Sequence, residues 1–183
     1  MAREIWSLFP EFTVSPVDTV DALLKPGSAK GLNSIMESKS DNHAEIKPFV
    51  LSGLRKLAIF CQQHENAEYQ ALIGKYGANY LKTLLNLYRE DDENRATGMT
   101  AVVMSTAREL VKVTPPAKLT AYYETAKVKA QSDDEEDKAV YWDIVVLLAP
   151  WLEPGAVESI FAEALEMTKS DTPMMQKKVN KIK

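Results

Sequence analysis

The amino-acid sequence predicts an all-α fold, a solenoid of stacked antiparallel helix pairs. Apolar residues recur at steps of three and four along most of the chain, which is the spacing of one helix face. Short polar turns, several containing proline, separate these periodic segments, and short connections make sequential helices antiparallel neighbours. Only 7 glycines among 183 residues argue against an all-β fold with many tight turns. A closed helical bundle is the alternative architecture.

Residues 1–90 carry the less regular part of the helical pattern. The opening from Ile5 to Pro10 is too apolar to be left in solvent and predicts a short capping helix. Apolar spacing between Val17 and Met36 predicts a helix that Pro26 and Gly27 interrupt. Residues 38–44 are polar and predict a loop.

Two longer helices follow in this half, from Ile46 to Cys61 and from Tyr69 to Tyr88. Gly74 and Gly77 are expected to loosen the second, because glycine is a poor helix former. The residues expected to face inward are Phe49, Val50, Leu54, Leu57, Ala58 and Cys61 in the first, and Tyr80, Leu81, Leu84, Leu85 and Tyr88 in the second.

Residues 95–183 show regular helix pairs. The first helix spans Arg95 to Val113 and ends at Thr114-Pro115-Pro116, because proline lacks the backbone donor and restricts the residue before it. The next helix begins there, with Thr114 as its expected cap. Inward positions are Met99, Val102, Val103, Thr106, Leu110 and Val113 in the first helix, and Leu119, Tyr122, Tyr123, Ala126 and Ala130 in the second.

The acidic run from Ser132 to Asp137 predicts a solvated turn and the first turn of a helix, where negative charge opposes the macrodipole favourably. A site for a basic partner or a metal is the alternative, but no histidine or cysteine lies nearby and the EF-hand spacing is missing. The segment from Ala139 to Ala149 is rich in β-branched residues, which suggests a strand on propensity alone. Its register and its end at Pro150 favour a helix buried on nearly all sides.

A further helix opens at Glu153-Pro154, and residues 170–173 close it before a last helix that begins at Met174. Its expected apolar positions are Val157, Ile160, Phe161, Ala164, Leu165 and Thr168.

Helix pairs also recur at about forty residues, since Met99, Val102 and Val103 have counterparts in Val140, Ile144 and Val145. This spacing lies within the roughly 40–47 residues of HEAT-type repeats. Each pair leaves an apolar face that the next pair covers, so the units stack. The sequence therefore predicts one HEAT- or armadillo-type helical-repeat segment over residues 1–183.

The sequence offers few groups for chemistry. His43 and His64 have no cysteine or carboxylate at metal-ligand spacing, and no phosphate-binding loop or nucleophile elbow is present. The lone Cys61 lies in an apolar run and is expected to be a packing residue of an intracellular protein. No stretch approaches the roughly 18 apolar residues of a membrane span. We expect a soluble protein that is not an enzyme and has no cofactor, metal or small-molecule substrate.

One local cluster is basic, although the whole chain has a net charge of −4. Lys177, Lys178, Lys181 and Lys183 lie close together at the end of the chain. They are candidates for contact with RNA phosphates through electrostatic attraction. The alternative is a solvated helix end, with cations placed near its negative pole.

Four segments in order resemble the ribosomal RNA-processing protein 12 family. They are Ile5 to Val20, Tyr80 to Tyr88, Trp142 to Leu152, and Ser170 to Lys178, whose acidic-Pro-x-x-Gln-Lys-Lys turn is similar to one in the family. Together they are spread over almost the whole chain, from Ile5 to Lys178.

The resemblance implies a HEAT-repeat scaffold of the nucleolus and nucleus, with shuttling to the cytoplasm. Such proteins join small-subunit ribosome precursors, support ribosomal RNA processing and help nuclear export of the particles. The implied partners are ribosome-assembly proteins, pre-ribosomal particles and the ribosomal RNA precursor. A transport or cytoskeletal HEAT-type adaptor is the alternative function, and a small helical enzyme is the third.

Two departures from the family stand out. Its members are several times longer, so this chain is expected to be a central piece of a longer protein. Asn180 stands where members usually carry an aromatic residue, and Lys183 comes before the last helix would be expected to finish.

Overall fold

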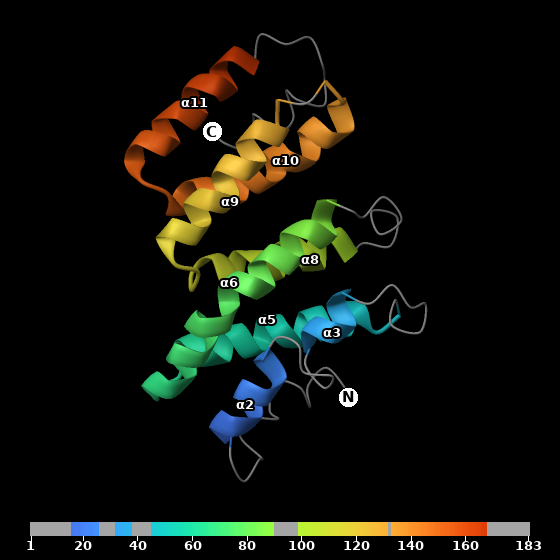
Figure 1. Ribbon diagram of the computed structural model, residues 1–183, viewed down its shortest axis with the longest axis vertical. Helices are drawn as coiled ribbons and strands as arrows, with labels where there is room; N and C mark the ends of the chain where they lie inside the picture. Colours follow the sequence, from blue (N-terminus) through green and yellow to red (C-terminus); the bar gives the residue numbers. More distant parts are fainter. Residues whose placement is uncertain (1–15, 26–31, 38–44, 90–98, 132, 168–183) are drawn as a thin grey trace. The chain divides into compact units, whose positions relative to one another are not determined.

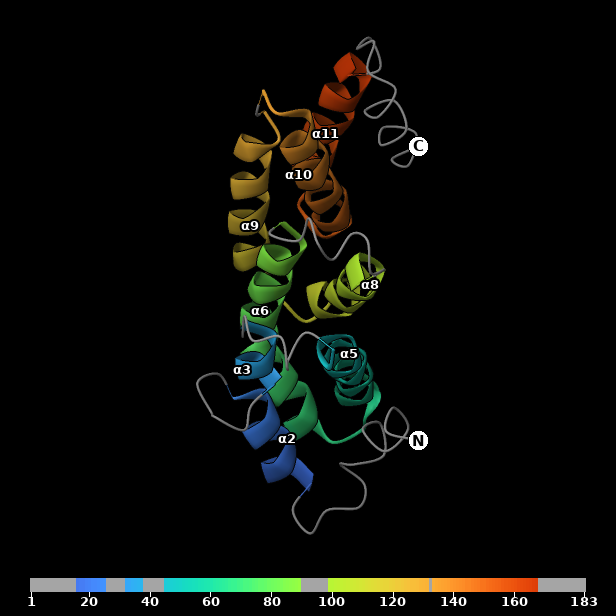
Figure 2. The ribbon, with the colours of Figure 1, turned by 90° about the vertical axis from the view of Figure 1, so that its right-hand side faces the viewer.

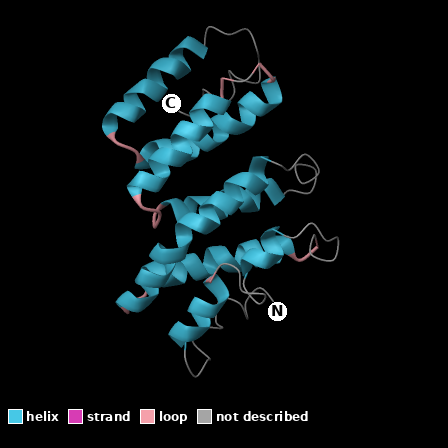
Figure 3. Cartoon of the chain, viewed as in Figure 1, coloured by secondary structure: helices cyan, strands magenta, loops and turns pink. Residues whose placement is uncertain are grey.

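The computed structural model describes residues 16–25, 32–37, 45–89, 99–131 and 133–167. Every regular element in these ranges is helical, as Figure 3 shows, which confirms the predicted all-α fold. The expected capping helix at Ile5–Pro10, the loop at 38–44, His43 and the last helix from Met174 lie outside the described residues. Contacts divide the chain into two compact units, Met1–Thr114 and Pro115–Lys183. The single repeat segment over 1–183, less regular before residue 90 and paired from residue 95, stays a prediction.

The first unit is built around three long helices (Figure 1). Its described elements are α2 (Pro16–Leu24), α3 (Leu32–Glu37), α5 (Lys47–Gln63), α6 (Ala67–Arg89) and α8 (Met99–Val111). Helix α8 packs against both α5 and α6, while α3 contacts the same two helices and α2 contacts α6. The core of this unit therefore lies between α5, α6 and α8.

Burial in the first unit follows the predicted helix faces, with one exception. The apolar positions expected to face inward on α6 are all buried, and so are those on α5 apart from Phe49. Phe49 is 45% exposed, so its predicted inward position is wrong. The reason is its place in the first turn of α5, where the buried row begins only at Val50.

Helix α6 is continuous through both of its glycines, which corrects the expected loosening. A Cβ atom at Gly77 would lie 2.9 Å from Cγ2 of Val113, whereas one at Gly74 would meet nothing within 4 Å. Gly77 therefore allows the chain after α8 to approach α6 closely, and Gly74 has no such role.

The second unit contains α9 (Pro116–Lys129), α10 (Glu135–Leu148), the short 3-10 helix η2 (Ala149–Trp151) and α11 (Pro154–Met167). Helices α9 and α10 lie side by side, as Figure 2 shows, and η2 contacts both α9 and α11. Helix α10 is buried nearly all round, as its apolar composition predicted. Its buried residues are Ala139, Val140, Tyr141, Trp142, Ile144, Val145, Leu147 and Leu148.

The expected cap at Thr114 is wrong. Pro115 occupies the N-cap position of α9 and makes no side-chain capping bond. The Thr114 hydroxyl instead donates to the carbonyl oxygen of Leu110 at 2.7 Å. A threonine hydroxyl readily bonds the carbonyl four residues earlier, and this competes with capping.

Candidate interaction surface

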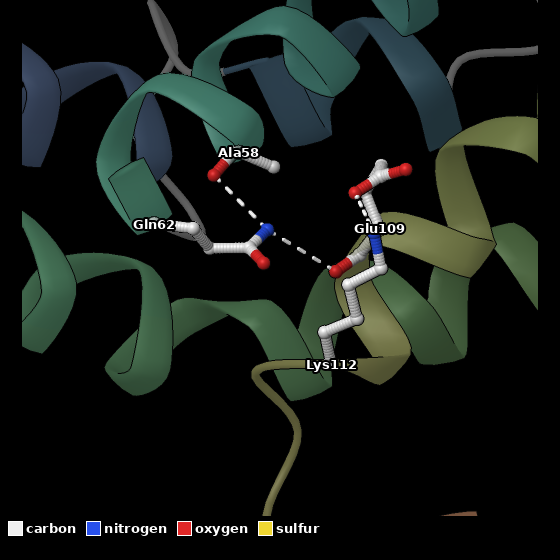
Figure 4. Close-up of polar contacts among 4 residues, drawn as sticks. All are labelled: Ala58, Gln62, Glu109 and Lys112. Carbon is white, nitrogen blue, oxygen red and sulfur yellow. Dashed lines mark hydrogen bonds and ion pairs between the residues drawn. The ribbon is translucent and has the colours of Figure 1, made fainter. Parts of the chain in front are cut away.

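Helix α8 is fixed to α5 by a side-chain amide. Nε2 of Gln62 lies 3.1 Å from the carbonyl oxygen of Ala58 on its own helix and 3.3 Å from that of Glu109 on α8 (Figure 4). Glu109 is in the last turn of α8, where backbone carbonyls lack helical partners. Lys112 adds a 2.6 Å ion pair to the Glu109 side chain. The amide thus joins two helices through a carbonyl that needs a donor.

A buried hydroxyl makes a second polar link between the same helices. Oγ1 of Thr106 lies 2.8 Å from the carbonyl oxygen of Val102 and 3.3 Å from that of Leu51 on α5. Thr106 is fully buried, as its predicted inward position required. Together with Gln62, it gives α5 and α8 a defined register.

Cys61 and His64, the side chains most capable of chemistry, are enclosed by packing and ring contacts. Cys61 is fully buried, and burial raises the pKa of its thiol to about 12. Nδ1 of His64 accepts a 3.0 Å bond from the backbone N–H of Asn66, and its ring lies 4.6 Å from that of Tyr69 and 5.0 Å from that of Phe60. Within the described ranges, no group of three or more histidine, cysteine or acidic side chains could hold a metal. These surroundings give Cys61 and His64 packing roles.

Exposed apolar side chains are the features that could meet a partner. In the first unit, Ile46 and Phe49 are 40% and 45% exposed at the start of α5. In the second unit, the exposed side chains are Val128, Trp151, Phe161 and Leu165. Periodicity predicted Phe161 and Leu165 to face inward, and that prediction is wrong, because α11 turns Ile160 into the core and leaves these two side chains 44% and 56% exposed.

Charge is distributed unevenly over the second unit. Residues 115–167 contain eleven aspartates and glutamates against four lysines. Residues 168–183 contain five lysines against one aspartate, and they include the candidate RNA-contacting residues Lys177, Lys178, Lys181 and Lys183. These four lysines lie outside the described residues, so their contact with RNA stays a prediction.

Comparison with known proteins assigns this set of helices to a family. The family model described as "Ribosomal RNA-processing protein 12, HEAT repeats" matches residues 1–91. The chain is 26% identical over 182 residues to an RRP12-like protein of Gallus gallus and 25% identical over 186 residues to one of Homo sapiens. Both alignments cover 98% of this chain.

The chain belongs to the ribosomal RNA-processing protein 12 family. It spans 13% of the length of each of these RRP12-like relatives. The family's HEAT repeats, matched over residues 1–91, agree with the helices of that part of the first unit and, with the all-helical structure of the described residues, confirm the predicted α-solenoid fold class.

The sequence pattern did not predict the exposed apolar pair Ile46 and Phe49. The family match over residues 1–91 includes this pair and the helices behind it. The first-turn position of Phe49 was the available signal, because a residue at a helix end can leave the buried row. Among the described residues, no helix has both the length and the apolar character needed to cross a membrane.

Proposed function

We propose that this chain is a non-catalytic scaffold segment that acts in small-subunit ribosome biogenesis. The observation that carries the proposal is membership of the RRP12 family, with relatives aligned over 98% of the chain. The finer steps that we assign are pre-ribosomal RNA processing, maturation of the particle and its nuclear export. The protein would then work in the nucleolus and nucleus and shuttle to the cytoplasm.

The first unit supplies a surface suited to protein contacts. Ile46 and Phe49 are exposed at the start of α5, while the apolar face of α5 that begins at Val50 is buried, and α5 contacts α3, α6 and α8. Gln62 and Thr106 tie α5 to α8. Apolar side chains held on such a rigid support lose little freedom on binding, which favours recognition of another protein.

We propose that RNA is contacted through Lys177, Lys178, Lys181 and Lys183. Residues 115–167 carry a large excess of carboxylates, and such a surface repels phosphates. Ribosome-assembly proteins are therefore the first partners that we propose, and the ribosomal RNA precursor is the second. No cofactor, small-molecule substrate or membrane belongs to this proposal.

The proposal is tested by a tagged pull-down from growing eukaryotic cells, with the bound proteins identified and the bound RNA sequenced. Small-subunit ribosomal RNA precursor together with its assembly factors is the expected recovery. Transport receptors or tubulin, recovered without precursor RNA, would overturn the proposal in favour of a HEAT-type adaptor.

Matched variants separate the two kinds of partner. Ile46→Ser with Phe49→Ser should reduce recovery of assembly proteins, whereas Val128→Ser, at a side chain that is 67% exposed on α9, is the control. Charge reversal of the four terminal lysines should reduce RNA recovery, with Lys118→Glu and Lys129→Glu as controls at exposed positions. Treating the lysate with ribonuclease shows which proteins bind without RNA.

A further inference from the structure

Helices α5 and α8 carry an excess of basic side chains, although the chain as a whole is acidic. Residues 47–63 and 99–112 contain five lysines and arginines against one glutamate, whereas the whole chain has a net charge of −4. Helix α5 has no aspartate or glutamate between Lys47 and Gln63. This part of the first unit therefore attracts negatively charged ligands.

The basic side chains lie on the outward sides of the two helices. On α5, Arg55 is exposed and Lys56 is partly exposed, because both fall outside the buried row that begins at Val50. Arg108 in the last turn of α8 and Lys112 directly after it are four residues apart and both exposed, so they lie on one side of the helix. We call Arg55, Lys56, Arg108 and Lys112 the α5–α8 basic surface.

Two hydrogen bonds between α5 and α8 bring these side chains to the same level. The Thr106 hydroxyl of α8 bonds to the carbonyl oxygen of Leu51. The Gln62 amide of α5 bonds to the carbonyl oxygen of Glu109. The segment of α5 between these contacts includes both basic residues of its outward side, and the segment of α8 between them includes Arg108. Figure 2 shows the two helices one above the other on the same side of α6.

Little negative charge opposes the α5–α8 basic surface. Glu109 is the one carboxylate of the two stretches, and its side chain is 16% exposed and lies 2.6 Å from Nζ of Lys112 (Figure 4). Within the described residues, neither Arg55 nor Arg108 forms an ion pair. Both guanidinium groups are thus available to a ligand, and their fork of donors matches two oxygens of a phosphate.

The side chains beside the arginines favour a nucleic-acid backbone over an acidic protein as the ligand. Ser52 precedes Arg55 by three residues, Ser105 precedes Arg108 by three, and exposed Ala101 lies further along the same side of α8. Beyond the first turn of α5, no large apolar side chain in the described part of these helices is exposed. Protein interfaces usually have an apolar core, whereas contacts with phosphates depend on charge.

We propose that the α5–α8 basic surface binds the phosphate backbone of RNA. The choice of RNA as the polyanion rests on the proposed function, and the surface is separate from the four lysines at the end of the chain. Because hydrogen bonds fix the register of α5 and α8, the fold sets the spacing of the bound phosphates. Binding of this kind is independent of base sequence and weakens as salt is added.

Binding of the full chain to polyuridylate, measured by fluorescence anisotropy over a range of salt concentrations, tests the proposal. Arg55→Gln with Arg108→Gln should weaken binding at least about tenfold at low salt and reduce the slope of log Kd against log salt by about 1.4, since each phosphate contact contributes about 0.7. Lys82→Gln with Lys118→Gln is the matched control. It removes the same charge from exposed positions outside the surface and should leave the slope unchanged.

Three results would overturn the proposal. They are the absence of polyuridylate binding by the parent chain, equal changes in the two double variants, and binding of polyglutamate as tight as that of polyuridylate at equal charge. The last result would identify an acidic protein segment as the ligand. Circular dichroism shows whether each variant is folded.

Ultraviolet crosslinking of the parent chain to polyuridylate gives a second measurement that needs no variant. Crosslinked peptides should come from residues 47–63 and 99–112, and crosslinks confined to other peptides would also overturn the proposal. The proposed function has a separate readout, which is the recovery of small-subunit assembly factors from cells. Loss of RNA binding by this surface with those factors still recovered would therefore reject the surface and leave the proposed function in place.

Discussion

The hydroxyl of Tyr76 on α6 donates a 2.7 Å hydrogen bond to Oδ1 of Asp21 on α2. The two residues are 55 positions apart in sequence, and the bond ties a nine-residue helix to the longest helix of the first unit. Nζ of Lys75 lies 3.9 Å from the same carboxylate oxygen and 4.8 Å from the centroid of the Tyr76 ring. The phenol and the ammonium thus share one acceptor.

Tyr76→Phe should lower the free energy of unfolding by about 1–2 kcal/mol, because the bond is to a charged acceptor in a partly buried site. The ring remains beneath Lys75, so the variant removes the hydroxyl alone. Urea unfolding followed by circular dichroism measures the change. Lys75→Met serves as the control and should leave stability unchanged, since exposed ion pairs contribute little. A larger loss from Lys75→Met than from Tyr76→Phe would contradict this assignment.

The two glycines of α6 should respond in opposite directions to alanine. Gly74→Ala should raise stability by about 0.5–1 kcal/mol, because alanine favours the helix and a Cβ there meets nothing within 4 Å. Gly77→Ala should lower it by about 1–3 kcal/mol, because its Cβ would lie 2.9 Å from the short Val113 side chain. Equal changes in the two melting temperatures would show that the contact with Val113 yields easily.

Local periodicity predicted helix positions well because most helices bury one continuous face. Both α10, apolar nearly all round, and the buried row of α6 match their sequence patterns. Periodicity could not show which apolar side of a helix has a neighbour. Phe161 and Ile160 are equally apolar, and only tertiary packing separates them.

The polar contacts that tie α5 to α8 could not be predicted from the sequence, for a second reason. Gln62 and Glu109 are 47 residues apart, and nothing in either local pattern pairs a glutamine amide with that carbonyl. Likewise, Thr114 has a suitable side chain for a cap, but it makes a bond back to Leu110 instead. Polar side chains have several partners of similar energy, so the surrounding fold decides among them.

The Cys61 thiol should react about a thousandfold more slowly with a disulfide reagent at pH 8 in the folded chain than in urea. Burial raises its pKa from 9.0 to about 12, which reduces the reactive thiolate, and the side chain is fully buried. Since the raised pKa favours the neutral thiol, its stabilising effect is present below pH 9 and is lost as the pH rises toward 12. Absorbance of the released thiolate gives the rate, and rapid native labelling would contradict the buried assignment.

Lys127 should contribute modestly to holding α11 on α9. Lys127→Met should lower the free energy of unfolding by about 0.5–1 kcal/mol at pH 7, because the two side chains are 26% and 36% exposed and solvent screens the pair. The hydrogen bond to Glu163 raises the lysine pKa above 10.5. The contribution is therefore present below pH 10.5 and disappears above it. A double-mutant cycle with Glu163→Gln isolates the pair, and zero coupling would contradict the link.

Gln62→Met should loosen α8 from α5 while keeping the side chain's length and apolar stem. The variant removes the donor to Glu109 and leaves that carbonyl in a partly buried place, at a cost of about 1 kcal/mol. Gln63→Met is the matched control, since Gln63 is exposed on the same turn. Hydrogen exchange distinguishes a local effect from a global one. Amides of the last turn of α8 should exchange faster in Gln62→Met than in Gln63→Met, while those in the centre of α6 change only by the global loss of stability. Equal exchange of the α8 turn in both variants would mean that apolar packing alone fixes its register.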